Sequence, residues 1–308
     1  MPFAKRCAYK ARLGRTVVII GKRYKLHEIL GQGGHGVVHR ATDLKTRTDV
    51  AIKFLHPNVA ADPEYNVRML REAQAMAALS GTSAIRVHEL GATDDGALYL
   101  VMELLVGKDL FQFMASLEAR GARVDPRLLF EYLGPIVDTL EAAHQRGIVH
   151  RDLKPSNIFI LEHGQGVRLL DFGLCKMMSA ASLTMDGMVA GSPSFIAPEV
   201  WKGNPRILDH RIDVYSLGAI IFRMLGGRVP FDAPTIFDKF KLVTTGERPS
   251  LHALRPDLSP LVDDWVRQAL AIDPAARFQN VRGMWNALRG VIGPTPSLRA
   301  PSPTTSVS

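Results

Sequence analysis

The first third of the chain is built from short apolar runs separated by turn residues. Ile29 and Leu30 lead to a glycine-rich turn, and β-branched runs follow at residues 37–38 and 50–52. Short runs of this kind, bounded by turn residues, are typical of β-strands. The pattern therefore predicts that residues 24–103 form mainly strands.

One stretch inside this region has a helical period. Between residues 67 and 79 apolar side chains recur at helical spacing, and residues 80–83, Ser-Gly-Thr-Ser, supply a stop signal. The apolar residues of the stretch are Met69, Leu70, Ala73, Met76, Ala77 and Leu79. We predict one long helix among the strands.

Beyond Gly107 the pattern becomes predominantly helical. Long amphipathic stretches cover residues 126–146, 211–226 and 260–272. Residues 291–308 are rich in Pro, Ser and Thr without periodicity, which predicts a flexible tail. The predicted fold class is α+β, with a small β-rich lobe that contains one long helix and a larger, mainly helical lobe.

Composition places the chain among globular proteins. Its 308 residues are 46% hydrophobic and 22% charged, which suffices for an ordinary core without disulfides or metals. No apolar run approaches the roughly 20 residues that span a bilayer, so we expect no membrane attachment by this chain itself. Cys7 and Cys175 lack metal-ligand spacing and fit a reducing compartment, which predicts a cytoplasmic location.

The formal charge of +8 is confined to the beginning of the chain. Residues 1–27 hold eight basic residues and no acidic one, whereas the remainder holds 30 of each sign. The folded body therefore has no excess charge to attract DNA or RNA, and nucleic acid is not an expected partner. Residues 1–23 form a basic arm, which either contacts anionic lipid or nucleic acid or is a solvated leader.

Candidate chemistry begins at the glycine-rich turn. Residues 31–36 and Val38 fit the pattern G-x-G-x-x-G-x-V, in which missing side chains let backbone amides approach phosphates. The turn consists of Gly31, Gln32, Gly33, Gly34, His35 and Gly36. Dinucleotide-binding folds use a similar run, but there the last glycine opens a helix, whereas β-type residues follow here. The next predicted strand ends in V-A-I-K, whose Lys53 can neutralise phosphate charge.

A partner for Lys53 is available on the predicted helix. Glu72 could reach the Lys53 ammonium and hold it against phosphates. Met76, four residues later on the same helix face, should then point inward. The alternative interpretation of Glu72 is an ordinary exposed helix glutamate.

The most specific motifs lie in the second half of the chain. H-R-D-L-K-P-S-N occupies residues 150–157, D-F-G occupies 171–173 and A-P-E occupies 197–199. In this order, after the glycine-rich turn and V-A-I-K, they resemble the motifs of eukaryotic-type (Hanks-type) serine/threonine protein kinases, in particular the bacterial branch. The resemblance covers the chain from about Tyr24 to Gly290.

The resemblance implies a kinase domain over residues 24–290, with an N-lobe at 24–102, a hinge at 103–106 and a C-lobe at 107–290. It also implies the activity of a non-specific serine/threonine protein kinase, which transfers the γ-phosphate of ATP to hydroxyls of protein substrates. The expected metal is Mg²⁺, with Mn²⁺ as an alternative. A homodimer through the N-lobe, common among such kinases, is a further expectation.

The catalytic roles follow from the matched motifs. Asp152 would orient and deprotonate the incoming hydroxyl, and Lys154 would contact the transferring phosphate; a lysine at this position points to serine or threonine acceptors. Asn157 and Asp171 would hold the metal. Ser192 stands where the family usually has threonine, and its hydroxyl would bridge the catalytic aspartate and lysine. The set supplies what phosphoryl transfer needs, namely carboxylates, cations and a proton acceptor.

The same resemblance implies an adenine pocket near residues 98–105, which match the last N-lobe strand and the hinge. The residues expected around adenine are Met102 as gatekeeper, Glu103 and Leu105 through their backbone groups, and Val38, Ala51 and Phe159 at its faces. Asp109 would meet the ribose hydroxyls, or else it caps the start of a helix.

Other matched residues would support the fold or its regulation. The structural set is His150 as a buried residue, Asp213 as the anchor of the catalytic loop, and Glu199 with Arg277 as an ion pair. Arg151 would receive a phosphate from the activation segment, where Thr184 and Ser182 are the favoured sites of autophosphorylation. One departure from the family is that residues 80–87 replace its His-Pro-Asn motif.

Two rival functions remain. A pseudokinase, which would serve as a binding module or scaffold, predicts loss of at least one of Lys53, Asp152, Asn157 or Asp171, and all four are present. A kinase-like small-molecule phosphotransferase would lack the activation segment and the A-P-E region, which this chain contains. Both observations favour the protein kinase.

Overall fold

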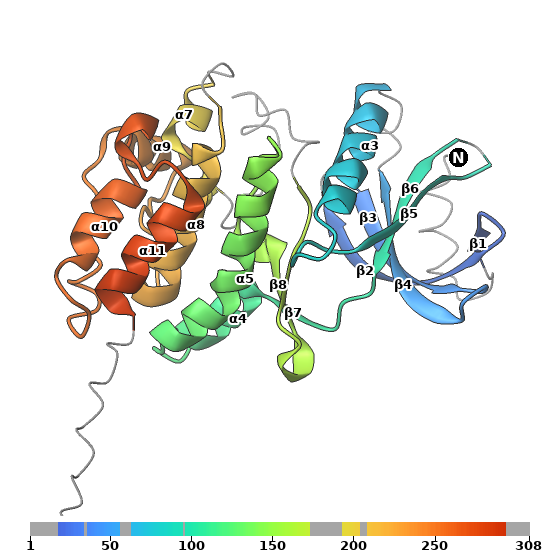
Figure 1. The fold of residues 1–308 in the computed structure, drawn as a ribbon, viewed down its shortest axis with the longest axis horizontal. Helices are drawn as coiled ribbons and strands as arrows, with labels where there is room; N and C mark the ends of the chain where they lie inside the picture. The colour runs from blue at the N-terminus through green and yellow to red at the C-terminus, as the bar shows by residue number, and fades with distance from the viewer. Residues whose placement is uncertain are drawn as a thin grey trace, which may run out of the picture.

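The computed structural model describes residues 18–33, 36–55, 63–94, 96–172, 193–203 and 208–293. Within these ranges the chain forms two lobes, a β-sheet with one helix beside it and a larger body of helices (Figure 1). The predicted two-lobed α+β architecture is therefore confirmed.

The small lobe is a six-stranded antiparallel sheet in the order β1-β2-β3-β4-β6-β5. Its strands are β1 (Ile19–Ile20), β2 (Tyr24–Gly33), β3 (Gly36–Asp43), β4 (Thr48–Leu55), β5 (Val87–Ala92) and β6 (Leu98–Glu103). The runs predicted as strands at residues 37–38 and 50–52 lie in β3 and β4. The glycine-rich turn joins β2 to β3, where Gly33 pairs with Gly36.

The two faces of this sheet contribute to separate cores, because successive side chains of a strand alternate between faces. Ile52 and Tyr99 belong to a small core of the lobe itself. Ala51 and Met102, on the opposite face, join the main core that continues into the large lobe. The alternation therefore turns the residues predicted to surround adenine toward the large lobe.

The helix of the small lobe is α3 (Pro63–Ala78). It covers nearly all of the predicted stretch 67–79 and starts four residues before it. Its first residue is Pro63, and proline is well tolerated at the first helical position. Met69, Ala73 and Met76 follow each other at spacings of four and three residues and are all buried. These three residues and Leu79 therefore pack in the main core, and Met76 points inward as expected. Leu70 and Ala77, which were predicted as part of the same apolar stripe, are exposed instead.

The large lobe surrounds one buried helix. Its helices are α4 (Leu110–Glu118), α5 (Pro126–Gln145), α7 (Pro198–Trp201), α8 (Arg211–Gly226), α9 (Ile236–Thr245), α10 (Val262–Ala269) and α11 (Val281–Ile292). Every residue of α8 except the first is buried, and α5, α10 and α11 contact one another or α8 along the lobe (Figure 1). The stretches predicted as helices correspond to α5, α8 and α10, although α10 is shorter than residues 260–272. In the described ranges no helix combines the length and apolarity needed to cross a bilayer.

A three-stranded sheet lies between the helices and the small lobe (Figure 1). It consists of β7 (Gly107–Asp109), β8 (Ile158–Leu161) and β9 (Val167–Leu169), in the order β7-β8-β9. Short 3₁₀ turns complete the lobe: η1 (Pro155–Asn157), η2 (Glu162–Gly164), η4 (Pro193–Phe195) and η6 (Pro274–Ala276). The turn η1 connects directly to β8, which brings the H-R-D segment next to this small sheet.

Residues 80–87, which replace the His-Pro-Asn motif, dock on the large lobe through their backbone. The amide of Ser83 donates to Thr139 Oγ1 of α5 at 3.0 Å. Leu169 N donates to the Ser83 carbonyl at 2.7 Å, and Ile85 N donates to the Leu169 carbonyl at 2.9 Å. Since backbone groups make these bonds, the connection does not require the side chains of the missing motif.

The sheet begins before the domain boundary predicted at residue 24. Ile19 pairs with Lys25 and Ile20 pairs with Tyr24, so β1 lies inside the segment predicted as the basic arm. Ile20 is buried in the small core, which explains why this apolar pair joins the sheet. At the other end α11 continues to Ile292, past residue 290.

Candidate active site

The H-R-D segment is held by a carboxylate from the buried helix α8. Asp213 accepts hydrogen bonds from the backbone amides of His150, at 2.8 Å, and Arg151, at 3.0 Å. Arg151 has a left-handed backbone with φ of 66°, a conformation that costs a non-glycine residue about 1–2 kcal/mol. The two hydrogen bonds to Asp213 offset that cost, so the predicted anchoring role of Asp213 has a direct structural basis.

Asp213 is itself buried and stays charged. Burial would raise the pKa of its carboxyl, but the hydrogen bond with His144 and the backbone donors outweigh that effect and hold the pKa below its usual value. His144 Nε2 lies 2.8 Å from Asp213 Oδ2. The sequence analysis did not single out His144, because nothing in the local pattern around it indicates a contact 69 residues away.

His150 is a neutral buried side chain, as predicted for a residue that does not act as a base. Its Nε2 lies 3.0 Å from the Leu170 carbonyl, and its Nδ1 accepts from the amide of Asp152 at 3.3 Å. These partners require a proton on Nε2 and a lone pair on Nδ1. Burial lowers the pKa of the imidazole, which agrees with that neutral form. The ring also packs against Phe172, with centroids 4.9 Å apart.

Two predicted site residues, Lys154 and Asn157, contact Asp152. Lys154 Nζ lies 2.9 Å from Asp152 Oδ2. Asn157 Nδ2 donates to the Asp152 carbonyl at 2.8 Å and to Asp152 Oδ2 at 3.2 Å. The amide nitrogen of Asn157 therefore faces the aspartate, which leaves Oδ1 as the atom suited to a metal ion.

The small lobe contributes Lys53, which contacts a residue of the large lobe. Lys53 Nζ donates to Asp171 Oδ1 at 2.9 Å, which joins β4 to the D-F-G segment. The surrounding protein would raise the pKa of Asp171, but the charge and hydrogen bond of Lys53 hold it below its usual value, so the carboxylate is ionised. Glu72 lies on α3 as predicted, and the position of its side chain lies outside the described part of the structure.

Three residues predicted around adenine, Val38, Ala51 and Met102, lie on the same face of the small-lobe sheet as Lys53. Val38 pairs with Lys53, and Ala51 pairs with Met102. Directly paired residues share one face of a sheet, so these four side chains line the same surface. Among the described residues, this is the surface beside Lys53 on which a flat ring could lie.

The remaining residues predicted around the nucleotide lie in the hinge and on β7 and β8. Glu103 N donates to the Arg86 carbonyl at 3.0 Å, so only its carbonyl remains to meet adenine. Leu105 is half-buried against the main core. Phe159 is half-buried on β8, directly paired with Asp109 of β7. Asp109 caps α4 by accepting from Gln112 N at 2.7 Å, which is the second of its two predicted roles.

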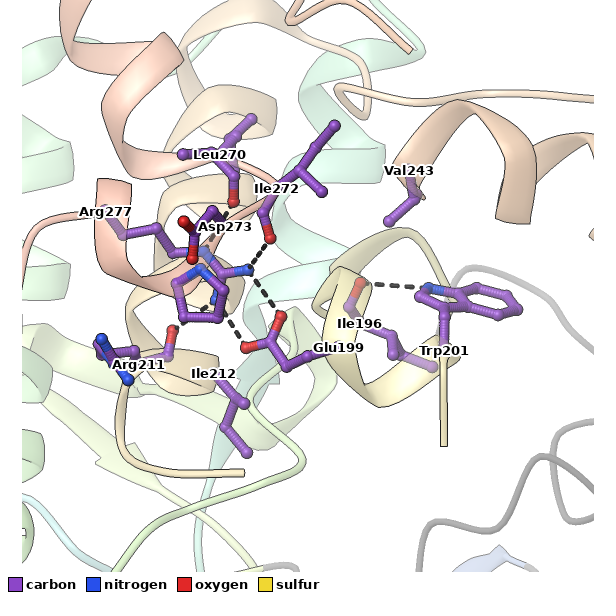
Figure 2. Close-up of polar contacts among 12 residues, drawn as sticks. Ile196, Glu199, Trp201, Arg211, Ile212, Val243, Leu270, Ile272, Asp273 and Arg277 are labelled. Atoms are coloured by element: carbon purple, nitrogen blue, oxygen red, sulfur yellow. Dashed lines mark hydrogen bonds and ion pairs between the residues drawn. The ribbon is translucent and has the colours of Figure 1, made fainter. Parts of the chain in front are cut away.

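The predicted ion pair between Glu199 and Arg277 is present deep in the large lobe (Figure 2). Arg277 Nη1 donates to Glu199 Oε1 at 2.7 Å, and Nη2 donates to Oε2 at 2.6 Å. The remaining guanidinium N–H groups donate to the carbonyls of Ala271, Arg211 and Ile272. The pair ties α7, which carries the A-P-E motif, to the chain just before α11.

Several predicted residues lie outside the described part of the chain. They are Gly34 and His35 of the glycine-rich turn, and Ser182, Thr184 and Ser192 of the activation segment. Gly31, Gln32, Gly33 and Gly36 are described and belong to β2 and β3. In the described residues, no group of three or more His, Cys, Asp or Glu side chains is arranged to hold a metal ion. A metal here would instead use the mixed carboxylate and amide pair of Asp171 and Asn157.

The bond from the small-lobe lysine Lys53 to the D-F-G aspartate, with the H-R-D aspartate nearby, is the arrangement expected of a protein kinase fold. The protein kinase domain model matches residues 24–285, so the chain belongs to that family. All of the motifs quoted above lie within that span. The predicted kinase fold and family are confirmed.

Similar proteins place the chain in the bacterial serine/threonine branch. It is 36% identical over 273 residues to the serine/threonine-protein kinase PknB of Mycolicibacterium smegmatis. This match covers 86% of this chain and 42% of PknB. It is 32% identical over 291 residues to PknL of Mycobacterium tuberculosis, covering 94% of this chain and 71% of PknL. The crystal structure of the M. tuberculosis PknI kinase domain superposes with a TM-score of 0.67 at 30% identity, covering 89% of this chain and 97% of that domain. The chain spans less than half the length of several curated relatives, PknB included.

Proposed function

We propose that this chain transfers the γ-phosphate of ATP to serine or threonine hydroxyls of protein substrates. The observation that carries the proposal is the contact between Lys53 of the small lobe and Asp171 of the D-F-G segment, together with the contact of Asn157 with Asp152. These residues come from both lobes, and a pseudokinase would have lost at least one of them. Phosphoryl transfer depends mainly on positioning and charge neutralisation, which is what this set provides.

In this proposal Asp152 accepts the proton of the attacking hydroxyl. Asn157 and the imidazole of His150 hold the loop around it through the contacts described above. Lys154 lies beside Asp152 and would stabilise negative charge on the phosphate as it is transferred. The direct in-line reaction needs no covalent intermediate on the protein.

Mg²⁺, when bound, would neutralise the negative charge that develops on the phosphate during transfer. Asp171 and Asn157 would hold it, because carboxylate and amide oxygens are the ligands that Mg²⁺ prefers; Mn²⁺ accepts the same oxygen ligands. The low pKa of Asp171 keeps its oxygens available as ligands at neutral pH. Adenine would lie against Val38, Ala51 and Phe159, with backbone groups of Glu103 and Leu105 at its edge.

The kinase domain in this proposal includes residues 24–290, with the hinge at 103–106 and the N-lobe and C-lobe on either side. Strand β1 lies just before this range, and α11 continues to Ile292. A cytoplasmic location is part of the proposal, and it is supported by the two cysteines without metal-ligand spacing. The partners are proteins with exposed serine or threonine. A homodimer through the small lobe stays a prediction.

Autophosphorylation of the activation segment, at Thr184 or Ser182, is also proposed. Arg151 is exposed and shares with Arg71 of α3 a cavity of about 310 Å³. A phosphate adds about two negative charges and would be attracted by two guanidinium groups. Phosphopeptide mapping of the active enzyme tests this, and an unmodified segment would contradict it.

The function itself is tested with radiolabelled ATP, magnesium and a generic basic protein. Wild-type chain should transfer label to serine or threonine, and Asp152→Asn should abolish that transfer. The control is Asp264→Asn, since Asp264 is an exposed residue of α10. ATP binding without any transfer by the wild type would support the pseudokinase, and label on small metabolites alone would support a small-molecule phosphotransferase.

A further inference from the structure

The two lobes are joined by a non-covalent contact in addition to the covalent hinge. Residues 83–86 run beside β9 of the large lobe and exchange backbone hydrogen bonds with Leu169. The same strand leads directly to Asp171 of the D-F-G segment. The place where the small lobe rests on β9 is therefore close in the chain to a proposed metal ligand.

Side chains of the hinge and of β9 reinforce this contact. Arg168 Nε donates to Glu103 Oε1 at 2.9 Å. The same carboxylate oxygen accepts from the amide of Arg86 at 2.8 Å, and Glu103 N donates back to the Arg86 carbonyl. Glu103 thus ties the end of β6 to residue 86 and to β9 at once.

The ion pair is partly shielded from water. The side chain of Glu103 is 21% exposed and that of Arg168 is 26% exposed. Hydrogen bonds in which both partners are charged are stronger than neutral ones, and partial burial reduces screening by salt. A second donor, Arg168 Nη1, bonds the Val167 carbonyl at 3.1 Å, which holds the guanidinium against its own strand.

Arg168 also has a defined relation to the proposed adenine site. It pairs directly with Phe159 across β8 and β9, so both side chains lie on one face of the three-stranded sheet. Arg168, which contacts Glu103, therefore projects from the same sheet face as Phe159, the residue proposed to lie against adenine.

We propose that Arg168 is a positioning residue for ATP: through Glu103 it holds the hinge over Phe159, so that backbone groups of Glu103 and Leu105 are in place before the nucleotide arrives. A site that is already ordered binds more tightly, because less conformational freedom is lost on binding. The inference rests on the proposed adenine site. Nothing in the kinase motifs assigns a role to Arg168.

The test measures nucleotide binding separately from turnover. Arg168→Met keeps the length of the side chain and removes its charge and donors. We expect it to weaken binding of a non-hydrolysable ATP analogue, measured by calorimetry with Mg²⁺, by about three- to tenfold. The KM for ATP should rise by the same factor while kcat changes less than about twofold, since the residue does not touch the reacting atoms. Arg168→Lys should recover part of the affinity.

Arg86→Met is the matched control. Arg86 is exposed and lies beside the same carboxylate, but its described contacts with Glu103 are made by its backbone, which the substitution keeps. Its ATP affinity should equal that of the wild type. A double-mutant cycle tests whether the two side chains act together. If they do, Arg168→Met should weaken ATP binding less in the Glu103→Gln background than in the wild-type background.

Each outcome supports or overturns the proposed role of Arg168. Unchanged ATP affinity in Arg168→Met, or an equal loss in Arg86→Met, would overturn the proposed role of Arg168 while leaving the kinase assignment intact. A wild-type chain that binds no ATP would instead refute the proposed adenine site, and the positioning role with it. Weaker binding in Arg168→Met alone, with partial recovery in Arg168→Lys, supports it.

Discussion

The guanidinium of Arg277 and the carboxylate of Glu199 meet through two hydrogen bonds at a place where neither side chain is more than 3% exposed. The residues are 78 positions apart in the chain. Arg277 also lies over the ring of Tyr215, with Cζ 5.0 Å from the ring centroid. The contact therefore joins α7, α8 and the segment before α11 at one point.

Removing one partner of this pair should destabilise the large lobe strongly. Arg277→Met leaves a buried carboxylate without its cation, which costs about 3–5 kcal/mol in comparable cases. The free energy of unfolding, measured in urea, should fall accordingly. Arg267→Met is the control, because Arg267 pairs with Asp264 where both side chains are at least 60% exposed; its effect should stay below about 1 kcal/mol. Equal stability of both variants would contradict the argument.

The anchor of the catalytic loop should matter for turnover more than for folding. Asp213→Asn keeps the size of the side chain but weakens its acceptance of the His150 and Arg151 amides. We expect kcat to fall about tenfold or more, because the left-handed backbone of Arg151 loses its support. The measurement is kcat with a basic protein substrate, alongside the melting temperature. Asp138→Asn, at an exposed position of α5, should leave kcat unchanged.

The stability of the fold should fall as the pH drops from 7 toward 5. Burial lowers the pKa of His39 and of His150 below the ordinary 6.5. Near pH 6.5 these histidines bind protons in the unfolded chain but stay neutral in the folded chain, so protonation favours unfolding. The free energy of unfolding should fall by at most about 1.4 kcal/mol per pH unit for each histidine.

Urea unfolding at several pH values measures this dependence. The double variant His39→Phe with His150→Phe should show a flatter slope between pH 7 and 5. The lowered pKa values of Asp171 and Asp213 act in a different range, since stability from these carboxylates is lost only as the pH falls below their ordinary 3.8. A wild-type stability that is constant or rises toward pH 5 would show that the buried histidines are not neutral.

Activity should depend on a divalent metal held by Asn157 and Asp171. Chelation with EDTA should stop transfer, and added Mg²⁺ should restore it. Asn157→Ala removes one oxygen ligand and should raise the Mg²⁺ concentration for half-maximal activity about tenfold or more. Gln279→Ala, which removes an amide side chain from the surface of the large lobe, serves as the control. An unchanged metal requirement in Asn157→Ala would exclude Asn157 as a ligand.

Much of the architecture could be predicted from local pattern. The apolar stripe of α3 and the strands at residues 37–38 and 50–52 follow from side-chain periodicity, which local backbone geometry dictates. Where the observed elements differ from the predicted ones, tertiary packing is the cause. The pair Ile19 and Ile20 is too short to indicate a strand, but burial of Ile20 against the small core adds it to the sheet as β1.

Candidate chemistry was predicted through ordered motifs, and the family resemblance also predicted the pairing of Glu199 with Arg277 and the anchoring role of Asp213. Other partners across the fold were not predicted. No spacing in the chain indicates that Arg168 reaches Glu103, or that His144 reaches Asp213. These side chains are ordinary in their local context, since an arginine in a strand or a histidine near the end of a helix is usually a surface residue. Their roles appear only when the elements that carry them are packed together.

The sequence by itself determined the order of the elements, the candidate catalytic residues and the family to which the chain belongs. Only the tertiary structure decided that Lys53 meets Asp171, that His144 contacts Asp213 and that residues 80–87 dock without the family's usual motif. The physical reason is that periodicity and motif spacing depend on a few neighbouring residues. Contacts between distant residues depend instead on how buried surfaces of separate elements fit together, and their geometry follows from the packing of the whole chain.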